Sequence, residues 1–210
     1  MTILQASQIA TVQRYDRLSE TYDRSHARWL RHAGGEAQCA FEGAAAALLR
    51  PGMRILDAAC GTGTVARRLL AGVEGRAHLT LLDASPDMLT QCRALEADRV
   101  QGRIEDLPFP DASFDLVTCA WGIETIGDAR MAIAEFVRVC RPGGHVCLVF
   151  CADRPARSWL AGVLRTAITR RGLGRFLDAA SVMQAGSQCG AVMAQPLHCT
   201  GPAAAILLRC

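Results

Sequence analysis

Glycines and carboxylates with a spacing suited to ligand binding lie in the first half of the chain. Residues 53–70 have the pattern of a buried strand, a loop of small residues containing Gly61 and Gly63, and a helix. Glycine permits positive φ and close approach of a ligand, and a helix N-terminus offers unpaired N–H groups. Asp83 ends the next apolar run, at the spacing of about twenty residues typical of a carboxylate that accepts ribose hydroxyls. This pattern predicts a nucleotide-type binding corner.

The glycine spacing alone leaves two classes of ligand open, because residues 61–66 also satisfy the dinucleotide pattern G-x-G-x-x-G/A. Asp57 ends the first strand, just before this loop. Its negative charge would repel a dinucleotide pyrophosphate but would tolerate a ligand with a cationic head. An NAD(P)-linked oxidoreductase is therefore the weaker alternative, and the short chain, without a recognisable proton-donor constellation, disfavours it further.

Alternating apolar runs and turn signals indicate the elements that must position these residues. We expect the first 50 residues to be helical, followed by parallel strands at residues 54–57, 77–83, 99–104, 114–120 and 145–151. Helices are predicted between these strands at residues 64–70, from Ser85 onward, and at 129–140. Short connections between such elements imply right-handed crossovers and a ligand crevice at the carboxyl ends of the strands.

The last quarter of the chain has a different pattern. Helices are predicted at residues 156–170 and 178–188, and strands at 191–198 and 203–209. Turn residues 200–202 separate the two strands, which indicates an antiparallel hairpin.

Composition excludes several classes of protein. The chain has 210 residues, 50% of them hydrophobic, which suffices for one α/β domain with a covered sheet. No apolar run is long enough to span a bilayer, and the first residues lack the order of a signal peptide, so we expect a cytoplasmic protein. A net charge of +3 does not indicate nucleic-acid binding. The ten cysteines form no C-x-x-C pair and the histidines have no metal spacing, so no metal site is expected.

Two further motifs follow along the chain: EDLPFPDASFD at residues 105–115, before the fourth strand, and RPGG at residues 141–144, before the fifth. In this order with the glycine loop and Asp83, the motifs resemble class I S-adenosylmethionine (SAM) dependent methyltransferases, from about Tyr15 to the C-terminus. The pattern is most similar to the ubiquinone/menaquinone C-methyltransferases and the phospholipid N-methyltransferases. The resemblance implies SAM as the cofactor. It also implies an α/β, Rossmann-like fold with helices on both faces of a seven-stranded, mostly parallel sheet that ends in a C-terminal antiparallel hairpin.

The resemblance also implies where SAM is held. Asp57 and the backbone of the glycine loop would hold its methionine part, Asp83 its ribose, and Glu105 and Asp106 would lie near its adenine. The full set of expected cofactor-binding residues is Asp57, Ala59, Gly61, Thr62, Gly63, Asp83, Ala84, Met88, Ile104, Glu105, Asp106, Cys119 and Tyr15.

The residues expected beside the methyl acceptor include departures from the family pattern. Glu124 stands where the quinone methyltransferases carry arginine, and Arg103 where they carry aspartate near the adenine. An anion in place of a cation disfavours a phenolate-like quinone precursor and favours an amine or a neutral nucleophile that loses a proton. The expected catalytic residues are Glu124, Tyr22 and His26, and the expected substrate-binding residues are Trp121 and Trp159. Tyr15 and Tyr22 belong to a Y-D-x-x-x-x-x-Y-D segment that in the family helps to close over SAM.

A basic and apolar segment, Arg157–Arg171, lies where the family places acceptor-side insertions. Its apolar face and flanking arginines would suit an anionic membrane surface, which makes a lipid headgroup amine a plausible acceptor and peripheral contact with the inner membrane an expectation. We expect residues 1–50 to be a helical cap on a methyltransferase core at residues 51–210, with residues 154–188 as an acceptor-side insertion.

The sequence therefore predicts a SAM-dependent methyltransferase that acts on a small or amphipathic molecule, such as a lipid headgroup amine or another small metabolite. Two alternatives remain within the same family. One is a C-methyltransferase for a quinone precursor, and the other is a SAM-binding partner subunit without catalysis, in which Arg103 and Glu124 would reflect decay of an ancestral site.

Overall fold

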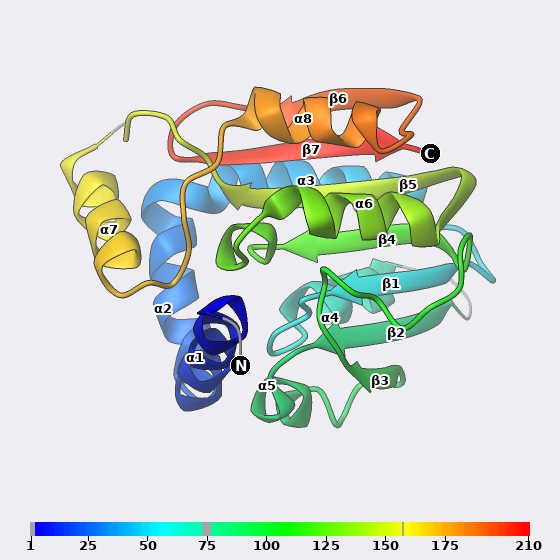
Figure 1. Ribbon diagram of the computed structural model, residues 1–210, viewed down its shortest axis with the longest axis horizontal. Helices are drawn as coiled ribbons and strands as arrows, with labels where there is room; N and C mark the ends of the chain where they lie inside the picture. The colour runs from blue at the N-terminus through cyan, green and yellow to red at the C-terminus, as the bar shows by residue number, and fades with distance from the viewer. Residues whose placement is uncertain (1–2, 73–76, 157) are drawn as a thin grey trace.

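A seven-stranded sheet forms the centre of the protein, and helices cover both of its faces (Figure 1). The computed structural model describes residues 3–72, 77–156 and 158–210. The strands are β1 (Arg54–Ala58), β2 (His78–Asp83), β3 (Asp98–Gln101), β4 (Phe114–Ala120), β5 (Cys140–Cys151), β6 (Met193–His198) and β7 (Ala203–Arg209). The helices are α1 (Ile3–Leu18), α2 (Tyr22–Trp29), α3 (Gly35–Leu48), α4 (Thr64–Gly72), α5 (Pro86–Gln91), α6 (Ala129–Val139), α7 (Trp159–Arg170) and α8 (Ala179–Gln188). A π-helical turn, Leu30–Gly34, joins α2 to α3, and a 3₁₀ turn, Ile123–Thr125, follows β4.

The strand order is β3-β2-β1-β4-β5-β7-β6, and the pairing is parallel except where β7 meets β5 and β6. This confirms the predicted Rossmann-like, mostly parallel sheet and its C-terminal antiparallel hairpin. In register, Ala58 of β1 lies beside Leu82 of β2 and Cys119 of β4, so the carboxyl ends of these three strands meet. The strand order reverses at β1, which is where open α/β sheets bind their ligands.

Two apolar cores, one on each face of the sheet, hold the layers together. On one face, Ile133 and Phe136 of α6 and Val182 of α8 pack on strands β4, β5 and β7. On the other face, Phe41 of α3 and Leu69 of α4 pack on β1, β2 and β5. The central strands are buried on both sides, as near-continuous apolar runs in parallel sheets require.

Side-chain caps begin several helices at the positions that the sequence predicts. Ser85 Oγ accepts a hydrogen bond from the backbone N–H of Met88 at 3.1 Å, and Pro86 occupies the first position of α5. Asp178 accepts from the N–H of Ser181 at 2.9 Å at the start of α8. These caps fix the point where the chain leaves the sheet edge and enters each helix.

Several boundaries differ from the prediction, and the largest differences lie at two places. The helical first 50 residues are interrupted between α1 and α2, so Tyr15 and Tyr22 lie on different helices, yet their rings meet with centroids 6.1 Å apart. Strand β5 begins at Cys140 rather than at residue 145. The chain passes through the exposed Pro142–Gly144 segment within the strand, where Gly143 has φ of +77° and the register with β4 shifts.

Helices α1 and α2 lie beyond the carboxyl ends of the central strands, and α7 lies further out on the same side, at the left of Figure 1. This end of the sheet is therefore covered by segments from both ends of the sequence. In the described part of the chain, no helix has the length and apolar character needed to cross a bilayer.

Candidate active site

The loop after β1 and the end of β2 are joined by hydrogen bonds. The N–H of Gly61 donates to Asp83 Oδ2 at 2.8 Å, and the N–H of Ser85 donates to Asp83 Oδ1 at 2.9 Å. Gly61 has φ of +54°, and a Cβ there would meet no atom within 4 Å, so the backbone at this residue borders open space. Burial raises the pKa of Asp83 above its ordinary value, against the effect of these N–H groups.

Ala59 has a backbone conformation that is typical of glycine. Its φ is +55°, in the left-handed region that residues with a Cβ rarely adopt. Close packing surrounds it, because a Cβ at Gly122 would lie only 2.7 Å from the Cβ of Ala59. The small residues at positions 59 and 122 therefore let two loops approach each other at the sheet edge.

Asp57 is buried beneath the glycine loop, with only 1% of its surface exposed. Thr118 Oγ1 donates to Asp57 Oδ1 at 2.9 Å, and among the described residues Oδ2 has no hydrogen-bond partner. Burial raises the pKa of Asp57 to about 7. A buried oxygen without a partner costs free energy unless another group approaches it. Asp57 does not line either cavity described below, so its contact with the methionine part of SAM stays a prediction.

A first cavity opens at the carboxyl ends of β1, β2 and β4, with a volume of about 760 Å³ including its mouth. Eight of the expected cofactor-binding residues line it: Tyr15, Ala59, Gly61, Asp83, Ala84, Met88, Ile104 and Glu105. The other expected residues do not border it: Asp57, Thr62, Gly63, Asp106 and Cys119. The lining combines a carboxylate, an open glycine backbone and apolar side chains, which fits a nucleoside with a polar sugar and an apolar-faced base.

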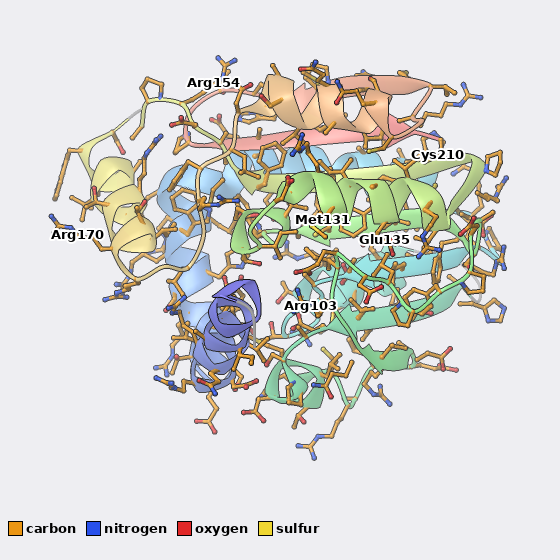
Figure 2. All side chains as sticks on the ribbon, in the orientation of Figure 1. Arg103, Met131, Glu135, Arg154, Arg170 and Cys210 are labelled. Atoms are coloured by element: carbon orange, nitrogen blue, oxygen red, sulfur yellow. The ribbon has the colours of Figure 1, made fainter. Side chains whose placement is uncertain are left out.

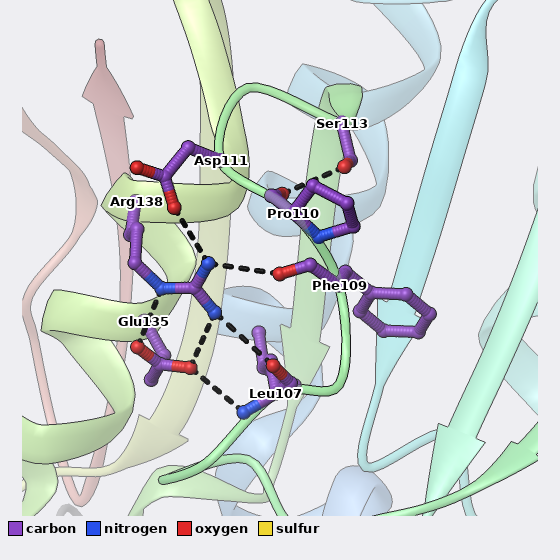
Figure 3. Close-up of polar contacts among 7 residues, drawn as sticks. All are labelled: Leu107, Phe109, Pro110, Asp111, Ser113, Glu135 and Arg138. Atoms are coloured by element: carbon purple, nitrogen blue, oxygen red, sulfur yellow. Dashed lines mark hydrogen bonds and ion pairs between the residues drawn. The ribbon is translucent and has the colours of Figure 1, made fainter.

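The segment expected near the adenine is held in place from α6 by Arg138 (Figure 3). Its guanidinium donates to the carboxylate of Glu135, to Asp111, and to the carbonyls of Phe109 and Leu107. Glu135 Oε2 in turn accepts from the N–H of Leu107 at 2.7 Å. This network orders the loop between β3 and β4, and with it the wall of the first cavity.

Arg103 lines the same wall and pairs with the nearly buried carboxylate of Glu105. The cation that replaces the family's aspartate is thus partly neutralised by its neighbour in the sequence. The pair places a guanidinium group and a carboxylate together on the wall expected near the adenine.

A second, larger cavity of about 1490 Å³ including its mouth adjoins the first, and the two share Tyr15, Tyr22 and Trp121. All three expected catalytic residues, Tyr22, His26 and Glu124, line it. They come from α2 and from the turn after β4, so the fold brings together side chains that are distant in the sequence.

Glu124 is only 3% exposed at the inner end of the second cavity. Its Oε1 accepts from the N–H of Cys151 at 3.1 Å, and among the described residues Oε2 has no hydrogen-bond partner. Burial raises the pKa of this carboxyl group to about 7. Gly174 allows the loop after α7 to close over it, because a Cβ at residue 174 would lie 2.9 Å from the Cγ of Glu124.

His26 stacks on Tyr22 with ring centroids 5.4 Å apart and meets the edge of Trp121 at 5.7 Å. Burial lowers its pKa to about 4, so the imidazole is neutral at physiological pH. Its Nε2 is buried and has no hydrogen-bond partner among the described residues. A neutral imidazole of such low basicity is a poor proton acceptor but can still position a substrate.

Trp121 is the shared wall of the two cavities, and three features fix its position. Its φ is +58°, its backbone N–H donates to the carbonyl of Val149 at 2.7 Å, and its Nε1 donates to Gln38 Oε1 at 2.7 Å. Gly34 leaves room for the ring, because a Cβ there would lie 2.7 Å from Trp121 and 2.6 Å from Nε1 of Trp29. Backbone strain that the surroundings hold in place in this way is common at functional sites.

Hydrogen bonds fasten the N-terminal helices over this end of the sheet. Asp23 of α2 accepts from Thr62 Oγ1 at 2.6 Å, and Asp16 of α1 accepts from the hydroxyl of Ser85. Tyr15 Oη donates to the carbonyl of Leu173 at 2.8 Å. The expected cofactor-binding residue Thr62 therefore contacts the helical cover rather than the cavity.

The structure does not bring Trp159 to either cavity, so its contact with the acceptor stays a prediction. Ser158 caps α7, and Trp159 in its first turn is 76% exposed. The expected single apolar face of α7 is also divided: Val163 is exposed, whereas Ile168 lines the second cavity. Arg157 lies outside the described residues.

Several cavity residues were not among the predicted site residues. They include three arginines of the second cavity, Arg14, Arg17 and Arg171, which come from α1 and from the end of α7. The sequence indicated only Arg171, as the end of the basic segment Arg157–Arg171, because Arg14 and Arg17 belong to no motif.

Comparisons with known proteins agree with this geometry. Residues 56–148 match the family described as "Methyltransferase domain". A malonyl-[acyl-carrier protein] O-methyltransferase from Erwinia billingiae is 39% identical over 131 residues, which cover 61% of this chain and 51% of the relative. A ubiquinone/menaquinone biosynthesis C-methyltransferase from Methylobacterium nodulans is 41% identical over 123 residues, covering 53% and 49%. The chain thus spans about half the length of the curated relatives it matches.

Among solved structures, the fold is similar to that of a SAM-dependent methyltransferase from Thermotoga maritima, described as a possible histamine N-methyltransferase. The TM-score is 0.69 at 20% identity, covering 93% of this chain and 97% of the other. Identity at this level supports the shared fold alone. The seven-stranded sheet and the helices around it thus belong to a known fold.

Proposed function

We propose that the chain, whose residues 56–148 match the family described as "Methyltransferase domain", transfers a methyl group from SAM to a small molecule. The observation that carries this proposal is the pair of adjoining cavities. The first has the lining of a nucleoside site, and the second ends at a buried carboxylate, Glu124.

The residues of the first cavity fit SAM in charge and shape. Asp83 would accept the ribose hydroxyls, and the backbone of Gly61, open to the cavity, would lie against the methionine part. Asp57, with its unpartnered Oδ2, would attract the cationic amino and sulfonium groups through the loop. When bound, SAM supplies a methyl group that is already activated for displacement.

For methyl transfer, the protein must also align the acceptor with the methyl group and accept one proton from the acceptor. Trp121 and Tyr22 separate the two cavities and would orient the acceptor toward the methyl group. Glu124 would take the proton, since a carboxyl group with a pKa of about 7 can both accept and release a proton near neutral pH.

Methylation of a quinone precursor is the second candidate, because a relative with 41% identity is named for that step. Glu124 argues against it here, since a buried carboxylate beside the acceptor repels a phenolate. We propose an acceptor that is an amine or a neutral nucleophile instead.

The exposed apolar residues of α7 support one finer proposal about location. Trp159, Leu160 and Val163 are exposed in the first half of α7, and the exposed Arg170 and Arg171 lie at its end, a composition suited to peripheral contact with an anionic membrane. We regard the chain as a cytoplasmic protein with such a contact, and residues 1–50 as the cap of a core at residues 51–210. Trp159→Ser should reduce sedimentation of the protein with anionic vesicles.

Calorimetric titration with SAM, S-adenosylhomocysteine and NADH tests the main proposal. We expect binding of the first two at micromolar concentration and no binding of NADH. Tight binding of NADH without binding of SAM would replace the proposal by an oxidoreductase. Binding of SAM by a protein that retains every site residue yet methylates no amine, hydroxyl or quinone precursor would support the non-catalytic partner subunit.

A further inference from the structure

Charges of opposite sign line the second cavity. Arg14, Arg17 and Arg171 border it from α1 and from the end of α7, and Arg17 and Arg171 are exposed. Glu124 is buried in the same lining. Among the described residues that line this cavity, Glu124 is the only carboxylate.

The three arginines share one region of the wall. Arg14 and Arg17 are three residues apart on α1 and so lie on the same helix face. The guanidinium of Arg14 donates to the carbonyl of Gly172, which places it beside Arg171. In the part of the chain that the structure describes, none of the three pairs with a carboxylate. A cluster of unpaired guanidinium groups binds carboxylates and phosphates well.

Glu124 could accept a group of the opposite charge. Its Oε2 is buried without a hydrogen-bond partner among the described residues, and no ion pair joins it to an arginine of the described cavity lining. Burial of an unpaired anion is costly, and a cationic ligand group would relieve the cost. An ammonium group also carries the proton that must leave before methylation.

The rest of the wall of the second cavity is largely aromatic and apolar. Tyr22, Trp29 and Trp121 contribute aromatic rings to it, and Leu18 and Ile168 contribute aliphatic surface. Such walls accommodate a short hydrocarbon spacer and stabilise a nearby ammonium group by cation–π attraction.

We propose that the acceptor is a zwitterionic amine, with a carboxylate or phosphate held by Arg14, Arg17 and Arg171 and its amino group beside Glu124. This inference rests on the proposed methyl transfer and names its substrate class. The ammonium group gives one proton to the Glu124 carboxylate. The nitrogen lone pair then forms the N–C bond to the methyl group as the C–S bond of SAM breaks, with its electron pair left on sulfur.

The test measures binding to protein saturated with S-adenosylhomocysteine, by calorimetry. The probes are phosphoethanolamine and 4-aminobutyrate, compared with ethanolamine and butyrate, which each carry one of the two charges. We expect each zwitterion to bind at least about 10-fold more tightly than its singly charged counterpart. Equal affinities of zwitterions and singly charged probes would overturn the proposal.

Single substitutions of the arginines test which of them contact the anionic group of the zwitterion. Arg17→Gln and Arg171→Gln should each weaken zwitterion binding by about 3- to 10-fold, as loss of one partly exposed charged contact would. Arg170→Gln is the control, because Arg170 is exposed on α7 and does not line the cavity (Figure 2). Identical losses in R170Q and R171Q would refute the arginine contact. Affinity for S-adenosylhomocysteine, measured in every variant, separates this failure from failure of the methyltransferase proposal.

A last pair of assays distinguishes the source of the zwitterion. Mass spectrometry would follow methylation of free phosphoethanolamine and of phosphatidylethanolamine in vesicles, with phosphatidylcholine vesicles as the control. Methylation of the vesicle lipid alone identifies a headgroup, and methylation of the free compound identifies a soluble metabolite. Either result supports the zwitterion. Methylation only of amines that lack an anionic group would overturn it.

Discussion

The two cavities share the wall formed by Tyr15, Tyr22 and Trp121 but differ in what builds the rest of them. The first is formed mainly by loops at the ends of parallel strands, with Asp83 fixed by backbone N–H groups. The second is formed by side chains of α1, α2 and the segment around α7, which approach one another only in the folded chain. This difference indicates that the geometry of the proposed cofactor side is fixed by the sheet, whereas that of the proposed acceptor side depends on the position of the helices that cover it.

The largest effect should come from removing the carboxylate of the first cavity. Asp83→Ala should lower affinity for S-adenosylhomocysteine by about 100-fold or more, because it removes charged contacts to the ribose and frees the N–H of Gly61. Calorimetry measures this loss. Asp87→Ala is the control, since Asp87 is exposed on α5 outside the cavity. Unchanged affinity in D83A would remove Asp83 from the ribose site.

A change in the second cavity should separate turnover from cofactor binding. Glu124→Gln should reduce methyl transfer by about 100-fold, since proton transfer to a positioned group contributes 10²–10⁴-fold. Affinity for S-adenosylhomocysteine should stay within about two-fold, because Glu124 does not line the first cavity. Single-turnover assays and calorimetry provide the two measurements. A fully active E124Q protein would refute the role of this residue.

The same substitution should change how stability depends on pH. Since the pKa of Glu124 is raised from 4.5 to about 7 in the folded protein, its stabilising contribution is complete below pH 4.5 and is lost as the pH rises through 7. Asp57 titrates in both proteins, so its effect cancels. From pH 5 to pH 8, the free energy of unfolding of E124Q should therefore rise by about 1–3 kcal/mol relative to the wild type. Urea denaturation at both pH values measures this difference, and a constant difference would contradict it.

The smallest effect on cofactor affinity should come from removing the hydrogen bonds by which Arg138 holds the loop between β3 and β4. Arg138→Met removes the guanidinium that holds the carbonyls of Leu107 and Phe109 while keeping the apolar stem. Affinity for S-adenosylhomocysteine should fall by about 3- to 10-fold, as one or two lost hydrogen bonds would predict. Arg130→Met, on an exposed position of the same helix, is the control. Binding of phosphoethanolamine should not change in either variant.

The difference between the two cavities also explains which parts of the structure could be predicted from the sequence. The sheet, its order of elements and the first cavity follow from local signals: apolar runs, the Ser85-Pro86 cap and the glycine spacing. Glu124 was predicted because it departs from a family pattern. Arg14 had no local signal, and Arg171 was noted only as the end of the basic segment Arg157–Arg171, since their juxtaposition depends on packing across about 160 positions of the chain. The exposure of Trp159 could not be predicted, because apolar residues at helical spacing do not show which side of a helix faces the core.

Gly34 has one further consequence, which concerns the optical properties of the protein. By leaving room for the rings of Trp29 and Trp121, it sets two of the three indoles of the chain in the wall of the second cavity, and the third, Trp159, is 76% exposed. Indole emission depends on the polarity of its surroundings. In a Trp159→Phe protein the intrinsic fluorescence would arise from the cavity wall alone, so occupancy of that cavity could be followed in real time without any attached label.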